Sequence, residues 1–134
     1  MNRLFVDTSA WFAYVNRRDP DHKAVRQVLR SFRGRLITSN YIFDETVTFC
    51  LNRLGHGTAA KVGVLLRDPA VVDLVRVTVA DEEQAWLLLL ARPDKEYSFT
   101  DCTSFVIMRR LGLTKALSLD EDFRQEGFVV LPIA

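Results

Sequence analysis

The chain has 134 residues, of which 49% are hydrophobic and 26% are charged, and its formal net charge at pH 7 is +1. This composition is typical of a globular protein with an apolar core, and it excludes a disordered or fibrous chain. No apolar run approaches the roughly 18 residues that a membrane span needs. Because the chain enters an apolar strand at once, we expect no signal peptide. We therefore expect one domain over residues 1–134, located in the cytoplasm and without a membrane partner.

The first apolar segment predicts a buried strand that ends at an acid. Leu4, Phe5 and Val6 form a continuous apolar run, as in strands that are covered on both faces of a parallel sheet. Asp7 follows, and either Thr8 or Ser9 can cap the helix that comes next. In open α/β sheets, ligands bind where strand ends meet helix starts, so we expect Asp7 to face such a crevice. The alternative is that Asp7 only caps the helix.

Positive charge is concentrated near the N-terminus, where residues 1–35 hold eight Lys or Arg residues against three Asp residues. Apolar residues at helical spacing from Val25 to Phe32 predict an amphipathic helix between Asp21 and Gly34. Another face of this helix carries four cations, which are Lys23, Arg26, Arg30 and Arg33. We interpret that face as a candidate nucleic-acid-binding surface, and a merely solvated basic face is the alternative.

The next segments repeat the order of strand, helix and acid. Residues 36–38 predict a strand, and Ser39 or Asn40 can cap a helix over residues 40–54 that Gly55 ends. Glu45 lies in the second turn of this helix, and adjacent Asp44 points about 100° away, so only one of the two can face the crevice. A helix is expected over residues 57–67 and a strand over residues 74–79. The acids at 81–83 are interpreted as complements of a helix dipole that add solubility, ahead of an apolar stretch over residues 85–91.

The last third of the chain contains a helix that is apolar nearly all round and begins with an acid. Ser98 or Thr100 can cap this helix, which runs to about residue 111, and Asp101 stands in its first turn. A carboxylate at the start of a buried helix is costly unless it is paired or bound to a metal. A strand over residues 116–119 ends at Asp120, and Asp122 follows two residues later. The strand over residues 128–131 is expected at a sheet edge, because Pro132 follows it.

Strands alternate with helices throughout, which predicts a three-layer α/β/α sandwich with a mainly parallel sheet. Right-handed crossovers bring the acids Asp7, Glu45, Asp101 and Asp120 to the same side of that sheet. Such carboxylates repel each other by about 4 kcal/mol per pair at 4 Å with an effective dielectric constant of 20, so a cation is expected among them. Oxygen ligands favour Mg²⁺ or Mn²⁺. Zinc is disfavoured, because the two histidines (His22 and His56) are far apart and the cysteines (Cys50 and Cys102) form no ligand pair.

Four short motifs occur in order along the chain. They are Phe5-Val6-Asp7-Thr8-Ser9, Asp44-Glu45-Thr46, Phe99-Thr100-Asp101-Cys102 and Ser118-Leu119-Asp120-Glu121-Asp122-Phe123. With these motifs the sequence resembles the PIN-domain ribonucleases, in particular the VapC-type toxins, over nearly its whole length.

The resemblance implies a metal-dependent endoribonuclease that hydrolyses RNA and leaves a 5′ phosphate. By this likeness the catalytic and metal-binding acids are Asp7, Glu45, Asp101 and Asp120, with Asp122 sharing or replacing the role of Asp120. Thr100 and either Thr8 or Ser9 are implied as polar supports. The cofactor is expected to be Mg²⁺ or Mn²⁺.

The resemblance also implies a toxin that forms a homodimer and is restrained by an antitoxin, whose tail places a basic side chain among the acids. Large apolar residues beyond what short helices can bury favour such an interface. The residues behind this expectation are Trp11, Phe12, Tyr14, Val15, Val62, Leu65 and Leu66.

Other functions agree with part of the same sequence pattern. A catalytically silent PIN-like module that binds RNA or protein, and a housekeeping PIN nuclease that is not a toxin, share the same motifs. A phosphoacceptor receiver domain is suggested by an acidic pocket with Lys115 nearby, but Ser39-Asn40 stands where that fold needs an Asp. A phosphatase with an Asp nucleophile needs Asp-x-Asp after the first strand, and this chain has Asp7-Thr8-Ser9.

Overall fold

The computed structural model describes residues 2–133, within which the chain forms five strands and seven helices. In chain order they are β1 (Arg3–Val6), α1 (Thr8–Val15), α2 (His22–Ser31), β2 (Arg35–Ser39), α3 (Asn40–Leu54), α4 (His56–Leu66), β3 (Val72–Val75), α5 (Val79–Ala91), α6 (Phe99–Leu111), β4 (Lys115–Leu117), α7 (Asp122–Gln125) and β5 (Val129–Leu131).

The strands form one sheet in the order β3-β2-β1-β4-β5, and every neighbouring pair is parallel. β1 is the central strand, with Phe5 opposite Ile37 of β2 on one side and Ala116 of β4 on the other. Leu4, Phe5 and Val6 are completely buried, as their continuous apolar run predicted. β5 lies at one edge of the sheet, as expected from the proline that follows it.

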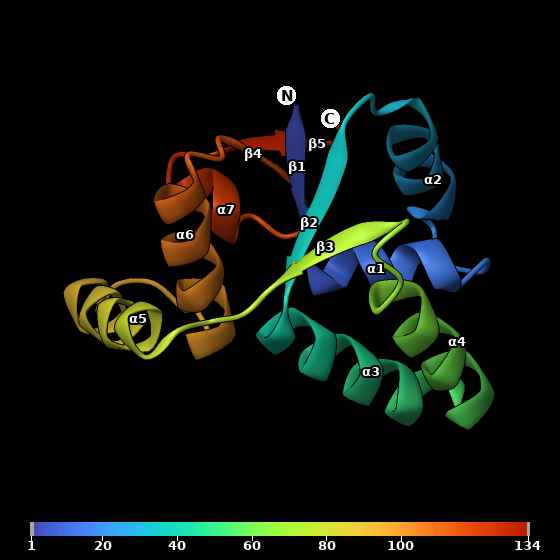
Figure 1. Ribbon diagram of the computed structural model, residues 1–134, viewed down its shortest axis with the longest axis horizontal. Helices are drawn as coiled ribbons and strands as arrows, with labels where there is room; N and C mark the ends of the chain where they lie inside the picture. Colours follow the sequence, from blue (N-terminus) through green and yellow to red (C-terminus); the bar gives the residue numbers. More distant parts are fainter. Residues whose placement is uncertain (1, 134) are drawn as a thin grey trace.

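Helices cover both faces of this sheet, which confirms the predicted three-layer architecture. Figure 1 shows α1 to α4 on one face and α5, α6 and α7 on the other. This division follows from right-handed crossovers, because the chain moves from β1 to β3 in one direction and then returns to build β4 and β5 beyond β1. The strand order therefore reverses between β1 and β4. In open α/β sheets, the ligand crevice lies at such a switch point.

Helix α6 forms the centre of the second face and is buried as its composition predicted. Cys102, Phe105, Ile107 and Met108 are fully buried. The Phe105 ring packs against Phe123 of α7, with ring centroids 5.0 Å apart in an edge-to-face arrangement. This contact holds α7, a short helix that the sequence analysis did not predict, against the core.

Strand β3 begins and ends earlier than predicted. It covers Val72–Val75, whereas the Val-rich segment had suggested residues 74–79. The backbone N–H of Val77 donates to Asn40 Oδ1 at 2.7 Å, and Thr78 caps α5, so these residues are bonded by side chains and not by a neighbouring strand. Thr78 and Asp81 form a reciprocal capping box, which explains why α5 begins at Val79.

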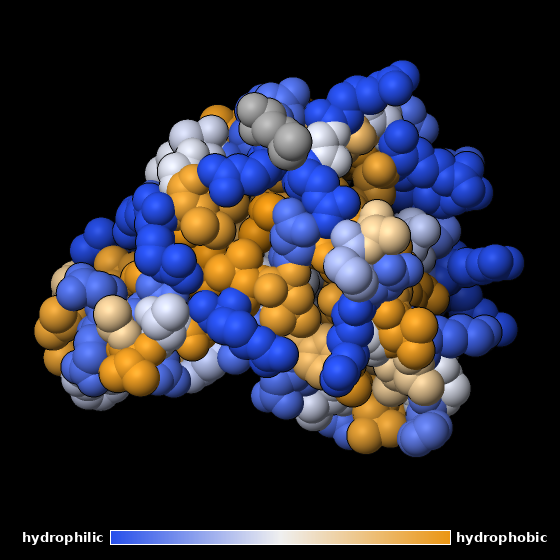
Figure 2. Space-filling model, in the orientation of Figure 1, coloured by the Kyte–Doolittle hydropathy of each residue, from blue (hydrophilic) through white to orange (hydrophobic). Residues whose placement is uncertain are grey.

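The apolar residues expected to form an interface lie largely inside the domain. Trp11, Val62 and Leu66 are buried, and the other four are partly buried against the core. Different large apolar side chains are exposed, notably Val79, Trp86, Leu87 and Leu90 on α5. Figure 2 shows apolar surface over α5 at the left of the view and in the hollow between α6 and β3.

Among the residues that the structure describes, every helix is too short or too polar to span a bilayer.

Candidate active site

A cavity of about 560 Å³ opens at the carboxyl ends of β1 and β4. Its volume lies within the range of small-molecule and cofactor sites. Four of its lining residues are Asp7, Glu45, Asp101 and Asp120, so the structure brings together the four acids predicted from the sequence. Each comes from a different strand end or helix start, as the topology requires.

Asp7 ends β1 and is 3% exposed. Its backbone carbonyl accepts from the N–H of Trp11 at 3.1 Å, so Asp7 itself is the N-cap residue, and the prediction that Thr8 or Ser9 caps α1 is wrong. Its carboxylate makes no capping hydrogen bond within the described chain. Instead, Oδ2 accepts from the hydroxyls of Ser9 and Ser118, each at 3.1 Å. The carboxylate is therefore oriented towards the cavity and does not act as a helix cap.

Glu45 reaches the cavity from the second turn of α3. Its Oε1 accepts from Thr8 Oγ1 at 2.6 Å, and Thr8 Oγ1 in turn accepts from Thr46 Oγ1 at 3.2 Å. Asp44 is exposed and does not line the cavity, which agrees with the expectation that only one of these two acids faces it. Sequence reasoning gave Thr46 no role. Its place next to Glu45 was the available signal.

Asp101 stands in the first turn of α6 and is held by a capping box. Its Oδ2 accepts from the Ser98 N–H, and Ser98 Oγ accepts from the Asp101 N–H, both at 3.0 Å. Ser98 is therefore the cap, and Thr100 is not. Thr100 was expected to support the acids, but the contact seen for it in the described chain is through its carbonyl, which accepts from Thr103 Oγ1 at 2.6 Å.

Asp120 and Asp122 both approach Asp101. One carboxylate oxygen from each of these three residues lies within 4.8 Å of the others. The Asp122 N–H donates to Asp120 Oδ1 at 3.2 Å, and the Asp120 N–H donates to Ser118 Oγ at 3.3 Å. Both acids near the end of the chain therefore lie in one group with Asp101. Ser118, whose role was missed, contacts both Asp7 and the backbone of Asp120.

Burial and mutual repulsion raise the pKa values of Asp7, Asp101 and Asp120. Burial, followed by the charges of Asp120 and Glu45, raises the pKa of Asp7 to about 7. Burial, followed by the neighbouring Asp122, raises the pKa of Asp101 to about 8. The pKa of Asp120 is also raised, by burial and by Asp122. A group of carboxylates with raised pKa values is stabilised by any cation that enters it.

The donor set fits a hard divalent cation. It consists of carboxylate oxygens, with hydroxyl groups behind them that fix their orientation, and Mg²⁺ and Mn²⁺ bind such ligands. Asp101, Asp120 and Asp122 form the tightest group, and Asp7 and Glu45 line the same cavity. His22 and His56 lie at the starts of α2 and α4, and neither lines the acidic cavity.

The predicted basic face of α2 divides into two parts. Arg26 and Arg30 line a groove of about 850 Å³ together with Arg17, His22 and Lys61. Lys23 and Arg33 are exposed but do not line this groove. Arg33 was predicted on the helix but lies beyond its end, because α2 stops at Ser31. Arg17 and Lys61, from the end of α1 and from α4, were not predicted. Their addition requires the packing of three helices, which helical periodicity alone does not reveal.

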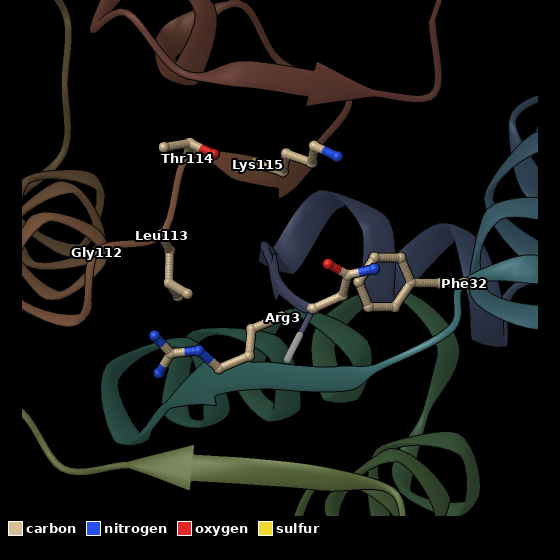
Figure 3. A pocket seen from close by; sticks show the side chains of 7 residues that line it. Arg3, Phe32, Gly112, Leu113, Thr114 and Lys115 are labelled. Carbon is tan, nitrogen blue, oxygen red and sulfur yellow. The ribbon is translucent and has the colours of Figure 1, made fainter.

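Lys115 lies at the opposite end of the sheet from the acids. It opens β4, whereas Asp120 follows the carboxyl end of that strand. Figure 3 shows Lys115 and Thr114 near Arg3, and together they line a separate cavity of about 220 Å³. The expectation of Lys115 near the acidic pocket is wrong, and the hypothesis of a phosphoacceptor receiver domain loses its cation.

Comparisons with known proteins agree with this geometry. The PIN domain model matches residues 4–129. The 23S rRNA-specific endonuclease VapC20 of Mycobacterium tuberculosis is 40% identical over 126 residues, which cover 94% of this chain and 95% of that protein. Ribonuclease VapC26 of the same organism is 29% identical over 119 residues, covering 87% and 86%.

Solved structures give the same result. The crystal structure of M. tuberculosis VapC20, a sarcin-ricin loop cleaving toxin, matches with a TM-score of 0.91 at 39% identity over 94% of this chain and 96% of that chain. A toxin-antitoxin complex from Klebsiella pneumoniae matches with a TM-score of 0.68 at 13% identity over 97% and 98%, which indicates a shared fold alone. The chain therefore belongs to the PIN-domain family.

Proposed function

We propose that this protein is a metal-dependent endoribonuclease that hydrolyses RNA phosphodiester bonds and acts as the toxin of a toxin-antitoxin pair. The observation that carries the proposal is the convergence of Asp7, Glu45, Asp101 and Asp120 on one cavity. The identity to VapC20, a 23S rRNA-specific endonuclease, supports ribonuclease activity and RNA as the substrate class.

The proposed cofactor is Mg²⁺ or Mn²⁺, held by Asp101, Asp120 and Asp122 together with Asp7 and Glu45. A bound ion of this kind activates water and stabilises the charge that develops on a phosphodiester. The chain's own contribution is to orient the ligands. Ser9 and Ser118 fix the Asp7 carboxylate, and the capping box fixes one oxygen of Asp101 so that the other is free to face the cavity.

The proposed RNA track runs over the basic groove of α1, α2 and α4. Arg17, Arg26, Arg30 and Lys61 are exposed there, and Asp19, which follows Arg17 by two residues, lines the acidic cavity. The groove and the cavity therefore lie on either side of the α1–α2 connection. Cations of this kind bind phosphates independently of sequence, while the acids cut. Lys23 and Arg33 extend the same positive field outside the groove.

The proposed partners are an antitoxin and a second copy of the chain. The toxin activity named for VapC20 supports an antitoxin. The exposed apolar side chains of α5 support a protein interface, because Trp86, Leu87 and Leu90 are each about half exposed. Since the proposed substrate is RNA, the proposed location is the cytoplasm.

Purified protein provides the test of the nuclease. We expect it to cleave RNA with Mg²⁺ or Mn²⁺ and to stop when EDTA removes the ion. Cleavage that continues in EDTA would contradict the metal-dependent mechanism, and binding of RNA without cleavage would favour the silent module. Growth arrest on expression, relieved by co-expression of the neighbouring antitoxin gene, would separate the toxin from a housekeeping nuclease.

The RNA track is tested by charge reversal. Arg26→Glu with Arg30→Glu should weaken RNA binding and lower the slope of log affinity against log salt by about 1.4 to 1.8, or about 0.7 to 0.9 per lost phosphate contact. The matched control is Lys23→Glu with Arg33→Glu, which lie on α2 and just after its end, outside the groove. Equal changes in salt slope for the two double variants would mean that the groove has no special role.

A further inference from the structure

Helices α1 and α3 each present a polar side chain and, four residues later, a phenylalanine towards the cavity. On α1, Thr8 and Phe12 are four residues apart, and on α3, Glu45 and Phe49 are four residues apart, so each pair lies on one helix face. Thr8 contacts Glu45 at 2.6 Å, and the rings of Phe12 and Phe49 meet with centroids 4.7 Å apart. The aromatic pair therefore lies one helical turn, about 5.4 Å, beyond the contact that holds Glu45.

These two rings form an apolar wall in a cavity whose other lining residues are acids, three hydroxyl residues and Leu119. Phe12 and Phe49 both line the cavity and are only partly buried. Aromatic rings that only fill the core of this protein, such as Phe5 and Phe105, are fully buried. The Phe12 and Phe49 rings meet edge to face, with an interplanar angle of 69°. The guanidinium of exposed Arg53 lies over the Phe49 ring, 4.8 Å from its centre.

An acid, an aromatic ring and a cation thus follow one another along a single face of α3, as Glu45, Phe49 and Arg53 at intervals of four residues. Each of these three groups can act on a different part of an RNA strand. The acids belong to the proposed catalytic group, and Arg53 adds positive charge where a strand leaves the cavity. The rings between them offer the apolar, planar surface against which unpaired bases stack.

We infer that the Phe12–Phe49 wall binds a nucleobase next to the scissile phosphate, so that the substrate is a loop or single strand with an unstacked base at that position. This inference rests on the proposed ribonuclease function and adds to it the residues that select the substrate. A base inside a continuous duplex has both faces covered by its neighbours, and it has no free face to offer to the wall.

The experiment uses a synthetic RNA hairpin that carries the 23S rRNA sarcin-ricin loop. Two further hairpins each carry one abasic nucleotide, either directly before or directly after the cleaved bond. We expect the wild-type protein to lose about tenfold in kcat/KM at one of these two abasic positions, from the lost stacking. Phe49→Leu should cut the intact hairpin about tenfold more slowly and show little further loss at that position. The inference would be overturned if Phe49→Leu lowered kcat/KM by the same factor, relative to the wild type, on the intact hairpin and on the abasic hairpin. It would also be overturned if the wild-type protein cut the intact and abasic hairpins equally fast.

Phe43→Leu is the matched control. Phe43 is a partly buried ring on the same helix under the guanidinium of Arg67, but it does not line the cavity. It should cut the intact and abasic hairpins as the wild type does.

Binding is measured separately with 2-aminopurine at the two flanking positions, without any need for cleavage. Quenching by the wild type and Phe43→Leu but not by Phe49→Leu supports base stacking even if the proposed nuclease activity fails. Equal quenching by all three proteins overturns the inference even if RNA is cleaved.

Discussion

Two groups of buried carboxylates in this domain have opposite surroundings. Glu126, at the end of α7, accepts from Arg92 Nε at 2.7 Å and from an Arg109 guanidinium nitrogen at 2.6 Å. Asp81, in the first turn of α5, accepts two hydrogen bonds from Arg110, at 2.8 and 2.9 Å. In contrast, none of the salt bridges found in residues 2–133 involves one of the acids at the cavity, which are Asp7, Glu45, Asp101, Asp120 and Asp122.

The difference is visible in the ionisation of these acids. Burial alone would raise the pKa of Glu126, but Arg92 and Arg109 hold it below the usual value. Burial would likewise raise the pKa of Asp81, and Arg110 and Thr78 hold it below normal. At Asp7 and Asp101 the pKa is raised, because burial is followed by further negative charges. Where the chain supplies the counter-charge, the carboxylate joins helices together. Where it does not, the counter-charge has to come from outside the chain.

The largest expected effect is on catalysis. Asp101→Asn removes one charge but keeps an oxygen that can accept from Ser98, so the cap of α6 should survive. We expect cleavage of RNA to fall at least about a hundredfold, or about 2.7 kcal/mol of transition-state stabilisation. Asp44→Asn, at the exposed neighbour of Glu45, is the control and should leave the rate unchanged. Activity of Asp101→Asn within tenfold of wild type would remove this acid from the proposed mechanism.

The second effect is a difference in sign between the two groups of carboxylates. Glu126→Gln should lower the free energy of unfolding by about 1–2 kcal/mol, because charge-assisted bonds from two partly exposed arginines are lost. Asp101→Asn, measured without metal at pH 8.5, should raise the free energy of unfolding, because it relieves repulsion. Urea denaturation followed by circular dichroism measures both changes. If both variants lost free energy of unfolding to a similar extent, the charge of Asp101 would be stabilised in the metal-free protein, and the contrast between the two groups would be wrong.

The pH dependence of stability sharpens the same contrast. In the metal-free protein, Asp7 and Asp101 have raised pKa values, of about 7 and about 8, against an ordinary value of 3.8. The unfolded chain therefore releases these protons first, and stability should fall as the pH rises from about 4 through about 8. We expect the Tm in EDTA to be lower at pH 8.5 than at pH 5.5, and Mg²⁺ to raise it more at pH 8.5.

Glu126 has the opposite sign, because its folded pKa lies below the ordinary value of 4.5. Its contribution is present above that value and is lost as the pH falls through the lower folded pKa. The Tm in EDTA should therefore be highest in the mildly acidic range and decline on both sides. Glu126→Gln should weaken only the decline on the acidic side, and Asp101→Asn only the decline on the alkaline side. A Tm in EDTA that rises steadily from pH 5.5 to pH 8.5 would contradict this account.

The smallest expected effect concerns Arg110. Its side chain is 41% exposed, so Arg110→Gln should cost only about 0.5–1 kcal/mol in urea denaturation. The capping box of Thr78 and Asp81 remains in this variant and retains part of the stabilisation. A loss above about 2 kcal/mol would show that Asp81 depends on the guanidinium as strongly as an uncompensated buried charge would.

The convergence of Asp7, Glu45, Asp101 and Asp120 could be predicted because it depends on local patterns and on one general rule of topology. Asp7 and Asp120 follow apolar strands, Glu45 and Asp101 follow helix starts, and right-handed crossovers bring all four to one side. The residues that orient them could not be predicted in the same way. Ser118 reaches Asp7 across 111 positions of the chain, and helical or strand periodicity contains no information about that contact.

The surroundings of buried charges could not be predicted from the sequence for the same reason. Asp81 was interpreted as a solvated acid, yet it is 3% exposed, because Arg110 on the next helix covers it. The apolar interface was predicted on α1 and α4, whereas the exposed apolar side chains lie on α5. In each case the decisive contact lies between helices, and sequence patterns describe one helix at a time.

The hydroxyl of Ser118 has a mechanical consequence. It donates to Asp7 at the end of β1 and accepts from the N–H of Asp120 beyond β4, so one small side chain sets the position of two acids from different strands. The two hydrogen bonds link the ends of β1 and β4 at the cavity and so restrain the spacing between the two acids. Since the affinity of a cation depends on the spacing of its ligands, Ser118 would help to hold the proposed metal site at one size.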